Sequence, residues 1–169
     1  MVARKLAARA VVTEGAPYRH LPSNGAAALE LFARLMNVYA ARVRAVVDAH
    51  APVEPQLRGI VRVSLAWCRA EPDALTLVLL GRPIFTAEPS DIIDYPIDAI
   101  EPLIREGQAE GSIRDGQPNL LAAIFLGCLL RPLIVSRFAQ PGSLDMLHDT
   151  QHDSVIAAAA CAAVAQPAS

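Results

Sequence analysis

The feature that most constrains the fold is a stripe of apolar residues that recurs every three or four positions. That spacing places the residues on one face of an α-helix, which has 3.6 residues per turn. The stripe consists of Leu29, Phe32, Ala33, Met36, Tyr39, Ala40, Val43 and Val47. The sequence therefore predicts a long amphipathic helix that ends near Ala49.

The rest of the chain also favours helices. Hydrophobic residues make up 53% of the 169 residues, and alanine and leucine dominate while β-branched and aromatic runs are few. After a proline-rich break, the helical stripe resumes from Leu57 to Cys68. Further helices are predicted over about Glu71–Leu80, Asp91–Ala109, Asn119–Ala139 and Leu144–Ala165, with Pro96 and Pro102 expected to bend or split the second of these. We expect an all-α protein with one sizeable core.

The segment Asn119–Ala139 is apolar nearly all round. Such a helix is buried against several neighbours or against another subunit. The last predicted helix is rich in alanine in its second half, which allows close helix packing. The apolar run Leu120–Leu130 stops at Arg131 and Pro132, so we expect it to be too short to cross a bilayer.

Charge is distributed unevenly along the chain. The formal net charge is −2, which argues against a protein that coats nucleic acid over its whole surface. The first twenty residues nevertheless contain only one acidic residue, Glu14, and four basic residues, Arg4, Lys5, Arg9 and Arg19. The pattern predicts a basic N-terminal end on an acidic body.

Three cysteines, Cys68, Cys128 and Cys161, lie far apart in apolar helical segments without CxxC spacing. They are typical of buried thiols in a reducing cytoplasm rather than of disulfides or metal ligands. The N-terminal apolar stretch Leu6–Val12 is short and contains Arg9, so it does not resemble a secretory signal. We therefore expect a soluble cytoplasmic protein.

His148 and His152 stand four positions apart near three aspartates, a spacing that can bind a divalent metal on one helix face. A solvated helix N-terminus explains the same acids without a metal, and we prefer that interpretation. The sequence contains no activated serine or cysteine motif and no glycine-rich phosphate loop. We expect no enzymatic activity, no cofactor and no metal.

The stretch "RKLAARAVVTEGAPYRHLPSNGAAALELFARLM" resembles the N-terminal signature of the TetR-type transcriptional regulators. In that family a helix ending "R-x-L-A-x-x-A-G-V" leads to a recognition helix of the form "T-x-G-A-L-Y-R-H-F-P-S-K". The later stretch "LIREGQAEGSIRDGQPNLLAAIFLGCLL" resembles the segment that joins the last helices in many members. The resemblance extends over nearly the whole chain.

The resemblance implies a small DNA-binding head, residues 1–24, on a helical body, residues 25–169, that binds a small molecule and dimerises through its last two helices. Thr13, Glu14 and Ala16 would face the major groove, while Tyr18 and His20 would contact phosphates. Arg4 and Arg19 add positive charge to the same head. The dimer interface would include Leu126, Leu130, Leu133, Ile156 and Ala160.

The head departs from the family pattern at several positions. Val11 replaces a turn glycine, and Pro17 replaces a leucine within the recognition helix, where a proline removes a backbone donor. Asn24 stands where a phosphate-binding lysine is usual. The chain begins at Met1 inside what would be the second helix of the head. We therefore expect a truncated, degenerate helix-turn-helix with weakened or lost operator binding.

The body carries aromatic and polarizable residues that can line a ligand cavity between helices: Met36, Tyr39, Trp67, Phe85, Tyr95 and Phe125. Taken singly, each is better explained as ordinary core. Arg131 needs a partner, either an anionic ligand or an acid across a dimer interface. The sequence thus predicts a ligand-responsive regulator of the repressor type that binds operator DNA as a homodimer. The alternative is a helical dimer that no longer binds DNA and takes a small hydrophobic ligand or a protein partner.

Overall fold

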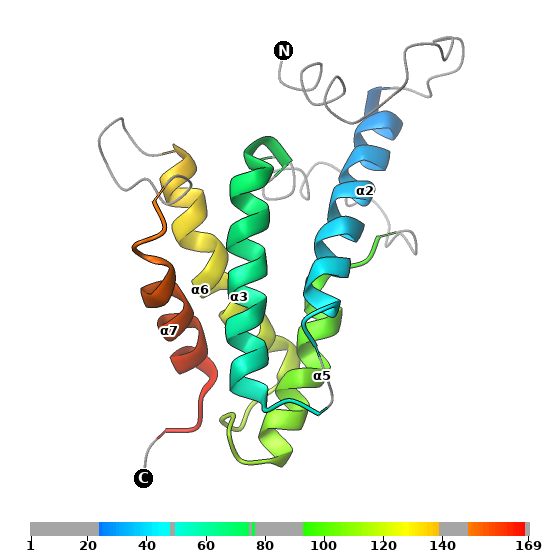
Figure 1. Ribbon diagram of the computed structural model, residues 1–169. Coiled ribbons are helices and arrows are strands. Elements are labelled where there is room, and N and C mark those ends of the chain that lie inside the picture. The colour runs from blue at the N-terminus through cyan, green and yellow to red at the C-terminus, as the bar shows by residue number, and fades with distance from the viewer. Residues whose placement is uncertain (1–23, 48–49, 75, 77–92, 139–148, 168–169) are drawn as a thin grey trace.

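The computed structural model describes residues 24–47, 50–74, 76, 93–138 and 149–167. The helices in these ranges are α2 (Asn24–Arg44), α3 (Val53–Ala70), α5 (Pro96–Ala109), α6 (Pro118–Phe138) and α7 (Asp153–Val164) (Figure 1). Residues 72–74 and 76 are also helical. No strand occurs in the described ranges, and a single isolated bridge joins Ile113 to Ala165. The predicted all-α class is confirmed.

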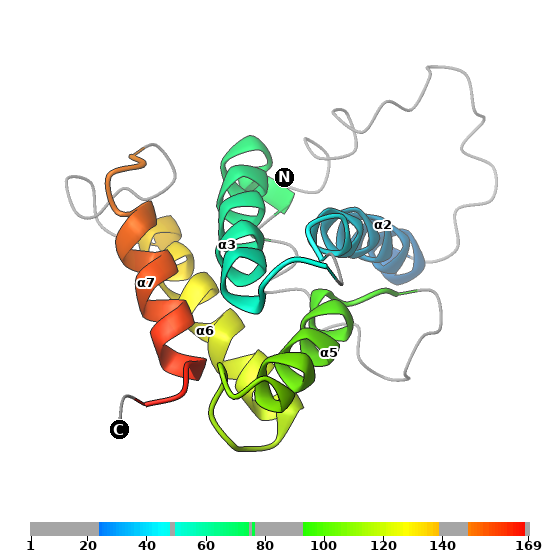
Figure 2. The ribbon, with the colours of Figure 1, turned by 60° about the horizontal axis from the view of Figure 1, so that its bottom comes forward.

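Helix α3 is the central element of the bundle. It packs against α2, α5 and α7, whereas α6 packs against α5 and α7. Figures 1 and 2 show α3 between α2 and α7 from two directions. Its inward side chains are buried, and Leu57, Ile60 and Leu65 are no more than 1% exposed. The burial of this apolar surface is the main force that holds the helices together.

Helix α2 follows the predicted stripe closely. Its members from Phe32 to Val43 are buried, and Leu29 and Val47 at the two ends are half-buried. The helix ends at Arg44, a few residues before the predicted end. Two 3₁₀-type bonds, Val46 N–H to Val43 and Val47 N–H to Arg44, tighten the chain there.

Helix α5 begins at Pro96, later than the predicted start at Asp91. Tyr95 is extended, as expected for a residue before proline. Proline fits the first helical position because the backbone N–H that it lacks would have no partner within the helix there. The Tyr95 N–H instead donates to the Asp98 carboxylate at 3.2 Å. Pro102 lies inside the helix without splitting it.

The turn after α5 fastens the C-terminal tail. Gly111 has φ +76°, a conformation that favours glycine, and it ends the helix. Arg114 N–H then donates to the Val164 carbonyl, and Gln166 N–H donates to the Ser112 carbonyl, each at 3.0 Å. The exit of α7 is therefore held against the turn that leads into α6.

Helix α6 was predicted to be apolar all round, and the structure divides it into two faces. The inner face is in the core and consists of Leu121, Ala122, Phe125, Leu129 and Leu133. The outer stripe is exposed and consists of Leu120, Ala123, Ile124, Gly127, Arg131 and Val135. From Pro118 to Ser136 the helix is long and apolar enough to cross a membrane by length and composition alone, so the prediction that it is too short was wrong. In the bundle, its inner face completes the hydrophobic core.

Helix α7 begins at Asp153, although the sequence predicted a start near Leu144. Residues 149–152 are not helical. The Asp149 carboxylate accepts the backbone N–H of Gln151 at 2.8 Å, a local bond that competes with helix formation. His152 is the residue that precedes the first helical turn, so the expectation that it shares a helix face with His148 was wrong. Residue 148 lies outside the described ranges.

Candidate functional site

The residues expected to contact DNA lie outside the described part of the chain. These are Arg4, Thr13, Glu14, Ala16, Tyr18, Arg19 and His20. Helix α2 begins at Asn24, directly after the segment that contains them.

Two of the predicted ligand-lining residues form the centre of the α2–α3 contact. The rings of Tyr39 and Trp67 are stacked, with centroids 4.7 Å apart and an angle of 5° between their planes. The Tyr39 hydroxyl donates to Ser64 Oγ at 2.9 Å, and all three side chains are buried. Burial raises the pKa of Tyr39 well above its usual value, because a phenolate would lose its hydration there.

The other predicted ligand-lining residues are dispersed. Met36 and Phe125 are buried in the core, Tyr95 is half-buried at the start of α5, and Phe85 lies outside the described residues. A shallow, open surface depression of about 500 Å³ lies on α2 and is lined by Glu30, Ala33, Arg34, Asn37, Val38 and Ala41. None of the predicted residues within the described ranges lines it. Apart from Tyr95, the described part of this set is thus core packing that includes the stacked Tyr39–Trp67 pair.

A polar clamp joins the second half of α2 to the segment before α5. Arg44 Nη2 donates to Asp94 Oδ2 at 2.7 Å. The Asp94 backbone N–H donates to Asn37 Oδ1, also at 2.7 Å. Both charged side chains are about half-exposed, at 47% and 51%, so water weakens the ion pair while the hydrogen-bond geometry still fixes the segment.

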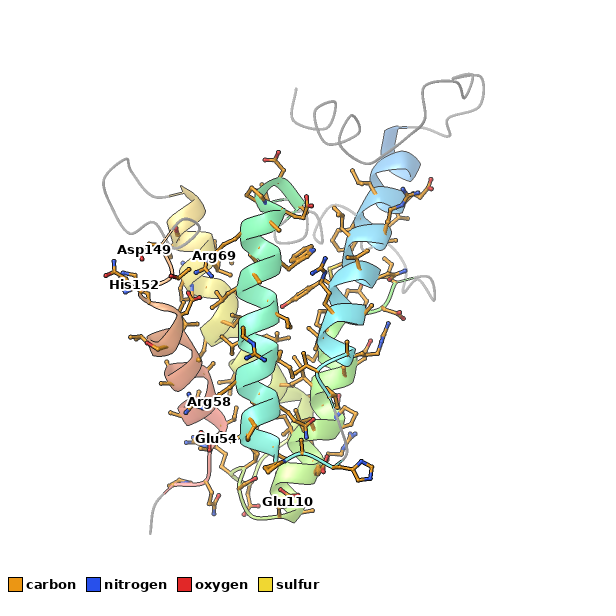
Figure 3. The ribbon with its side chains drawn as sticks, viewed as in Figure 1. Glu54, Arg58, Arg69, Glu110, Asp149 and His152 are labelled. Atoms are coloured by element: carbon orange, nitrogen blue, oxygen red, sulfur yellow. The ribbon has the colours of Figure 1, made fainter. Side chains whose placement is uncertain are left out.

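A second polar link joins the end of α3 to the start of α7. Arg69 donates to both Asp153 carboxylate oxygens, at 2.8 and 2.5 Å, and to the Asp149 carbonyl at 3.3 Å. Figure 3 shows Arg69 directed toward Asp149 and His152 at this end of the bundle. The Arg69 side chain is only 19% exposed. Its hydrogen bonds to Asp153 raise the pKa of the guanidinium further above its usual value.

The residues expected at a dimer interface are mostly interior. Leu133 and Ala160 are fully buried and Ile156 is 5% exposed within the single chain, so they are not available to a partner in this conformation. Leu126 and Leu130 are half-buried on the flank of α6. The available surface of these two helices instead carries four large apolar side chains: Leu120, Ile124, Val135 and Val155 are 39–64% exposed. Arg131 is exposed on the same stripe.

The cysteines are free thiols, with Cys68 and Cys161 buried and Cys128 half-buried. Cys161 lines a groove of about 250 Å³ between α3, α7 and the turn at Ser112. Figure 3 labels Glu54 and Arg58 on the α3 side of this groove, and their side chains form an ion pair. Burial raises the pKa of Cys161, which disfavours a reactive thiolate. Among the described residues, no group of three or more His, Cys, Asp or Glu side chains could hold a metal.

Sequence reasoning missed the polar residues that connect the helices. Ser64 was recognised as part of the α3 stripe, but its bond to Tyr39 depends on how α2 faces α3. Arg69 and Asp153 are 84 positions apart, and Arg44 and Asp94 are 50 apart. No local pattern signals such pairs, because only the packing of the helices brings them together.

The chain matches no family model and no curated protein. Its fold is similar to a 2.10 Å crystal structure from Shewanella sp. PV-4 that is described as "a putative tetR family transcription regulator". The alignment has a TM-score of 0.62 and 19% identity, and it covers 86% of this chain and 77% of that chain. This helical chain therefore has a TetR-like fold.

Proposed function

We propose that this protein is a transcription regulator that binds operator DNA as a homodimer and responds to a small hydrophobic ligand. The observation that carries the proposal is the agreement of two separate signals. The fold is similar to a solved structure described as a TetR-family regulator over 86% of the chain. The recognition-helix signature stands immediately before α2, where a DNA-binding head attaches in that family. A cytoplasmic, non-enzymatic role as a repressor is part of the same proposal.

The proposed head is residues 1–24 and the proposed body is residues 25–169. Thr13, Glu14 and Ala16 read base edges, and Tyr18 and His20 hold the phosphate backbone. Because phosphate contacts are insensitive to sequence, loss of Tyr18 weakens binding to all DNA alike. Val11 and Pro17 reduce affinity, since neither residue suits the turn and helix that the motif requires.

The proposed dimer uses the outer faces of α6 and α7. Monomeric soluble proteins seldom expose a contiguous row of large apolar side chains. Here Leu120 and Ile124 lie one turn apart on the exposed stripe of α6, and Val135 lies farther along it, beyond Gly127 and Arg131. On α7, Val155 is 64% exposed. A second copy presents the same surface, and a twofold axis pairs the two patches.

The proposed ligand response acts through α2. A small hydrophobic molecule that enters beside Met36, Tyr39 and Trp67 would separate α2 from α3, because that space is close-packed in the free protein. The Arg44–Asp94 clamp ties the same helix to the start of α5. A shift of α2 moves the attached head in each subunit and so changes the spacing of the two recognition helices, which must match half-sites about 34–36 Å apart.

Fluorescence anisotropy tests the proposal. The chain is titrated into labelled DNA that flanks its own gene and into scrambled DNA of the same length, at several salt concentrations. A regulator binds its own DNA more tightly than the scrambled control, and both affinities fall steeply with salt as counterions are released. Equal, feeble binding to both DNAs contradicts operator binding.

A repaired variant separates a weakened head from a misassigned one. Val11→Gly with Pro17→Leu restores the family pattern, and Tyr18→Phe in that background removes a proposed phosphate contact. We expect the repaired chain to bind more tightly than the natural chain and to lose part of the gain with Tyr18→Phe. If repair changes nothing, these two positions are not what limits DNA binding.

A further inference from the structure

Gly127 is an exposed glycine in the middle of α6. Glycine destabilises a helix interior because it loses more conformational freedom on folding than other residues. The other helical glycines with described surroundings have a steric reason inside the chain. A Cβ atom at Gly59 would lie 2.6 Å from Val46 Cγ1, and one at Gly107 would lie 2.3 Å from Ile113 Cγ1. At Gly127 it would meet nothing within 4 Å.

Gly127 lies at the centre of the exposed apolar stripe of α6. Ile124 is three residues before it, and the half-buried Leu130 is three residues after it. Of the five large hydrophobic side chains that are exposed among the described residues, Val38 alone lies off α6 and α7. The helix from Pro118 to Phe138 contains no acidic residue. The surface is therefore complementary to a second apolar helix face and offers no salt bridge to a basic partner.

We propose that two copies of this chain cross at Gly127, with the two α6 helices antiparallel at the crossing and the missing side chains allowing their backbones to approach closely. This rests on the homodimer of the proposed function and names the position and direction of its helix crossing. A glycine at a crossing point removes the side chain that would otherwise hold the helices apart. Its helix-destabilising effect is then offset only in the dimer.

Arg131 determines the direction of the crossing. It is exposed on the same stripe, one turn beyond Gly127. In a parallel crossing the two Arg131 guanidinium groups would face each other next to the axis, and like charges repel. In an antiparallel crossing they lie eight residues apart along the helices, about 12 Å at 1.5 Å per residue, beyond the Debye length at physiological salt.

The antiparallel register also matches side-chain sizes. A residue four positions after Gly127 faces one that lies four positions before it in the other copy. Arg131 is thus opposite Ala123, an exposed residue small enough to leave room for the arginine stem. Ile124 is opposite Leu130, so apolar side chains meet on both sides of the crossing.

Sedimentation velocity over a micromolar concentration series tests the crossing. The variants are Gly127→Ala and Gly127→Leu, with Ala66→Leu as the control for a leucine at an exposed position of another helix. We expect Gly127→Ala to raise the dimer dissociation constant about tenfold, Gly127→Leu to abolish the dimer, and Ala66→Leu to leave it unchanged. The melting temperature of the dilute monomer should rise with Gly127→Ala, because alanine is the better helix former. This opposite response separates the interface effect from misfolding.

Mild oxidation of cysteine variants tests the direction. In a Cys128→Ala background, a mixture of Ala123→Cys and Arg131→Cys chains should form a disulfide-linked dimer, whereas each variant alone should not. Efficient cross-linking of Ala123→Cys alone, a variant that keeps Arg131, indicates a parallel crossing and overturns the register. If Gly127→Leu remains a full dimer, the crossing is elsewhere and only this inference fails. If the natural chain is monomeric, the inference and the proposed homodimer both fail.

Discussion

At the scale of single residues, the contact between α2 and α3 includes a buried hydrogen bond. Tyr39 donates to Ser64 Oγ at 2.9 Å while its ring stacks on Trp67. A buried hydroxyl that loses its partner keeps the full cost of removal from water. The two hydroxyls are therefore interdependent, and their contribution to stability has to be measured as a pair.

A double-mutant cycle measures that dependence. Ser64→Ala leaves the buried Tyr39 hydroxyl without its acceptor and should lower the free energy of unfolding by about 1–3 kcal/mol. Tyr39→Phe should cost less, because a helical serine hydroxyl can turn to a carbonyl of the preceding turn. The double variant should be more stable than Ser64→Ala alone. Urea denaturation measures all three, and strictly additive losses would contradict the coupling.

The buried thiol of Cys68 predicts a loss of stability at alkaline pH. Burial raises its pKa to about 12, whereas the pKa of a cysteine in the unfolded chain is about 8.5. Between these values the unfolded chain releases a proton that the folded chain keeps. The free energy of unfolding should therefore be unaffected by this group below about pH 8.5 and fall by up to about 1.4 kcal/mol per pH unit above it.

Cys68→Ala checks the origin of that alkaline slope. The free energy of unfolding in urea is measured for the natural chain and the variant at about pH 8 and about pH 10, below and above the pKa of a free thiol. In the variant the free energy of unfolding should still fall as the pH rises, but less steeply, because burial also raises the pKa of Cys161. Identical slopes would show that Cys68 is not protected from ionisation in the folded state.

At the scale of elements, the Arg69–Asp153 pair fixes where α7 starts relative to α3. Arg69→Ala removes hydrogen bonds from a side chain that is 19% exposed and leaves Asp153, 34% exposed, without its cation. We expect the free energy of unfolding to fall by about 1.5–3 kcal/mol, the range for hydrogen bonds to charged groups. Arg58→Ala is the matched control, because it breaks an exposed ion pair with Glu54 within one helix, and it should change stability far less. Equal effects in thermal or urea unfolding would contradict a special role for Arg69.

The elements themselves could largely be predicted from the sequence, because helical periodicity is local. The stripe from Phe32 to Val43 and the apolar helix from Pro118 to Phe138 were both expected. The sequence placed the starts of α5 and α7 too early. Pro96 begins α5, and the bond between Asp149 and Gln151 keeps the residues before α7 out of a helix. Hydrophobic periodicity detects neither effect. The two faces of α6 could not be told apart because both are apolar. Leu133 and Ala160 were therefore expected at the interface although they lie in the core.

At the scale of the whole molecule, the proposed dimer would link folding to assembly through the apolar surface of α6 and α7. In a dimer whose subunits are stabilised by association, the melting temperature rises with protein concentration. The predicted DNA target has two half-sites, so loss of the dimer also weakens operator binding. A variant that disrupts the proposed interface should then change stability, oligomeric state and DNA affinity together. If the apolar patch does not mediate association, the three properties should vary independently.

Ile124→Asp tests this coupling against a closely matched control. Ile124 is 39% exposed on α6, and Val38 is 43% exposed on α2, away from the proposed interface. An aspartate at 124 must lose water if two copies associate, so Ile124→Asp should be monomeric in sedimentation, and its melting temperature should no longer depend on concentration. Val38→Asp should remain a dimer with the concentration dependence of the natural chain. If both variants dimerise alike, the copies associate through another surface; if both are monomeric, added charge rather than its position breaks the assembly.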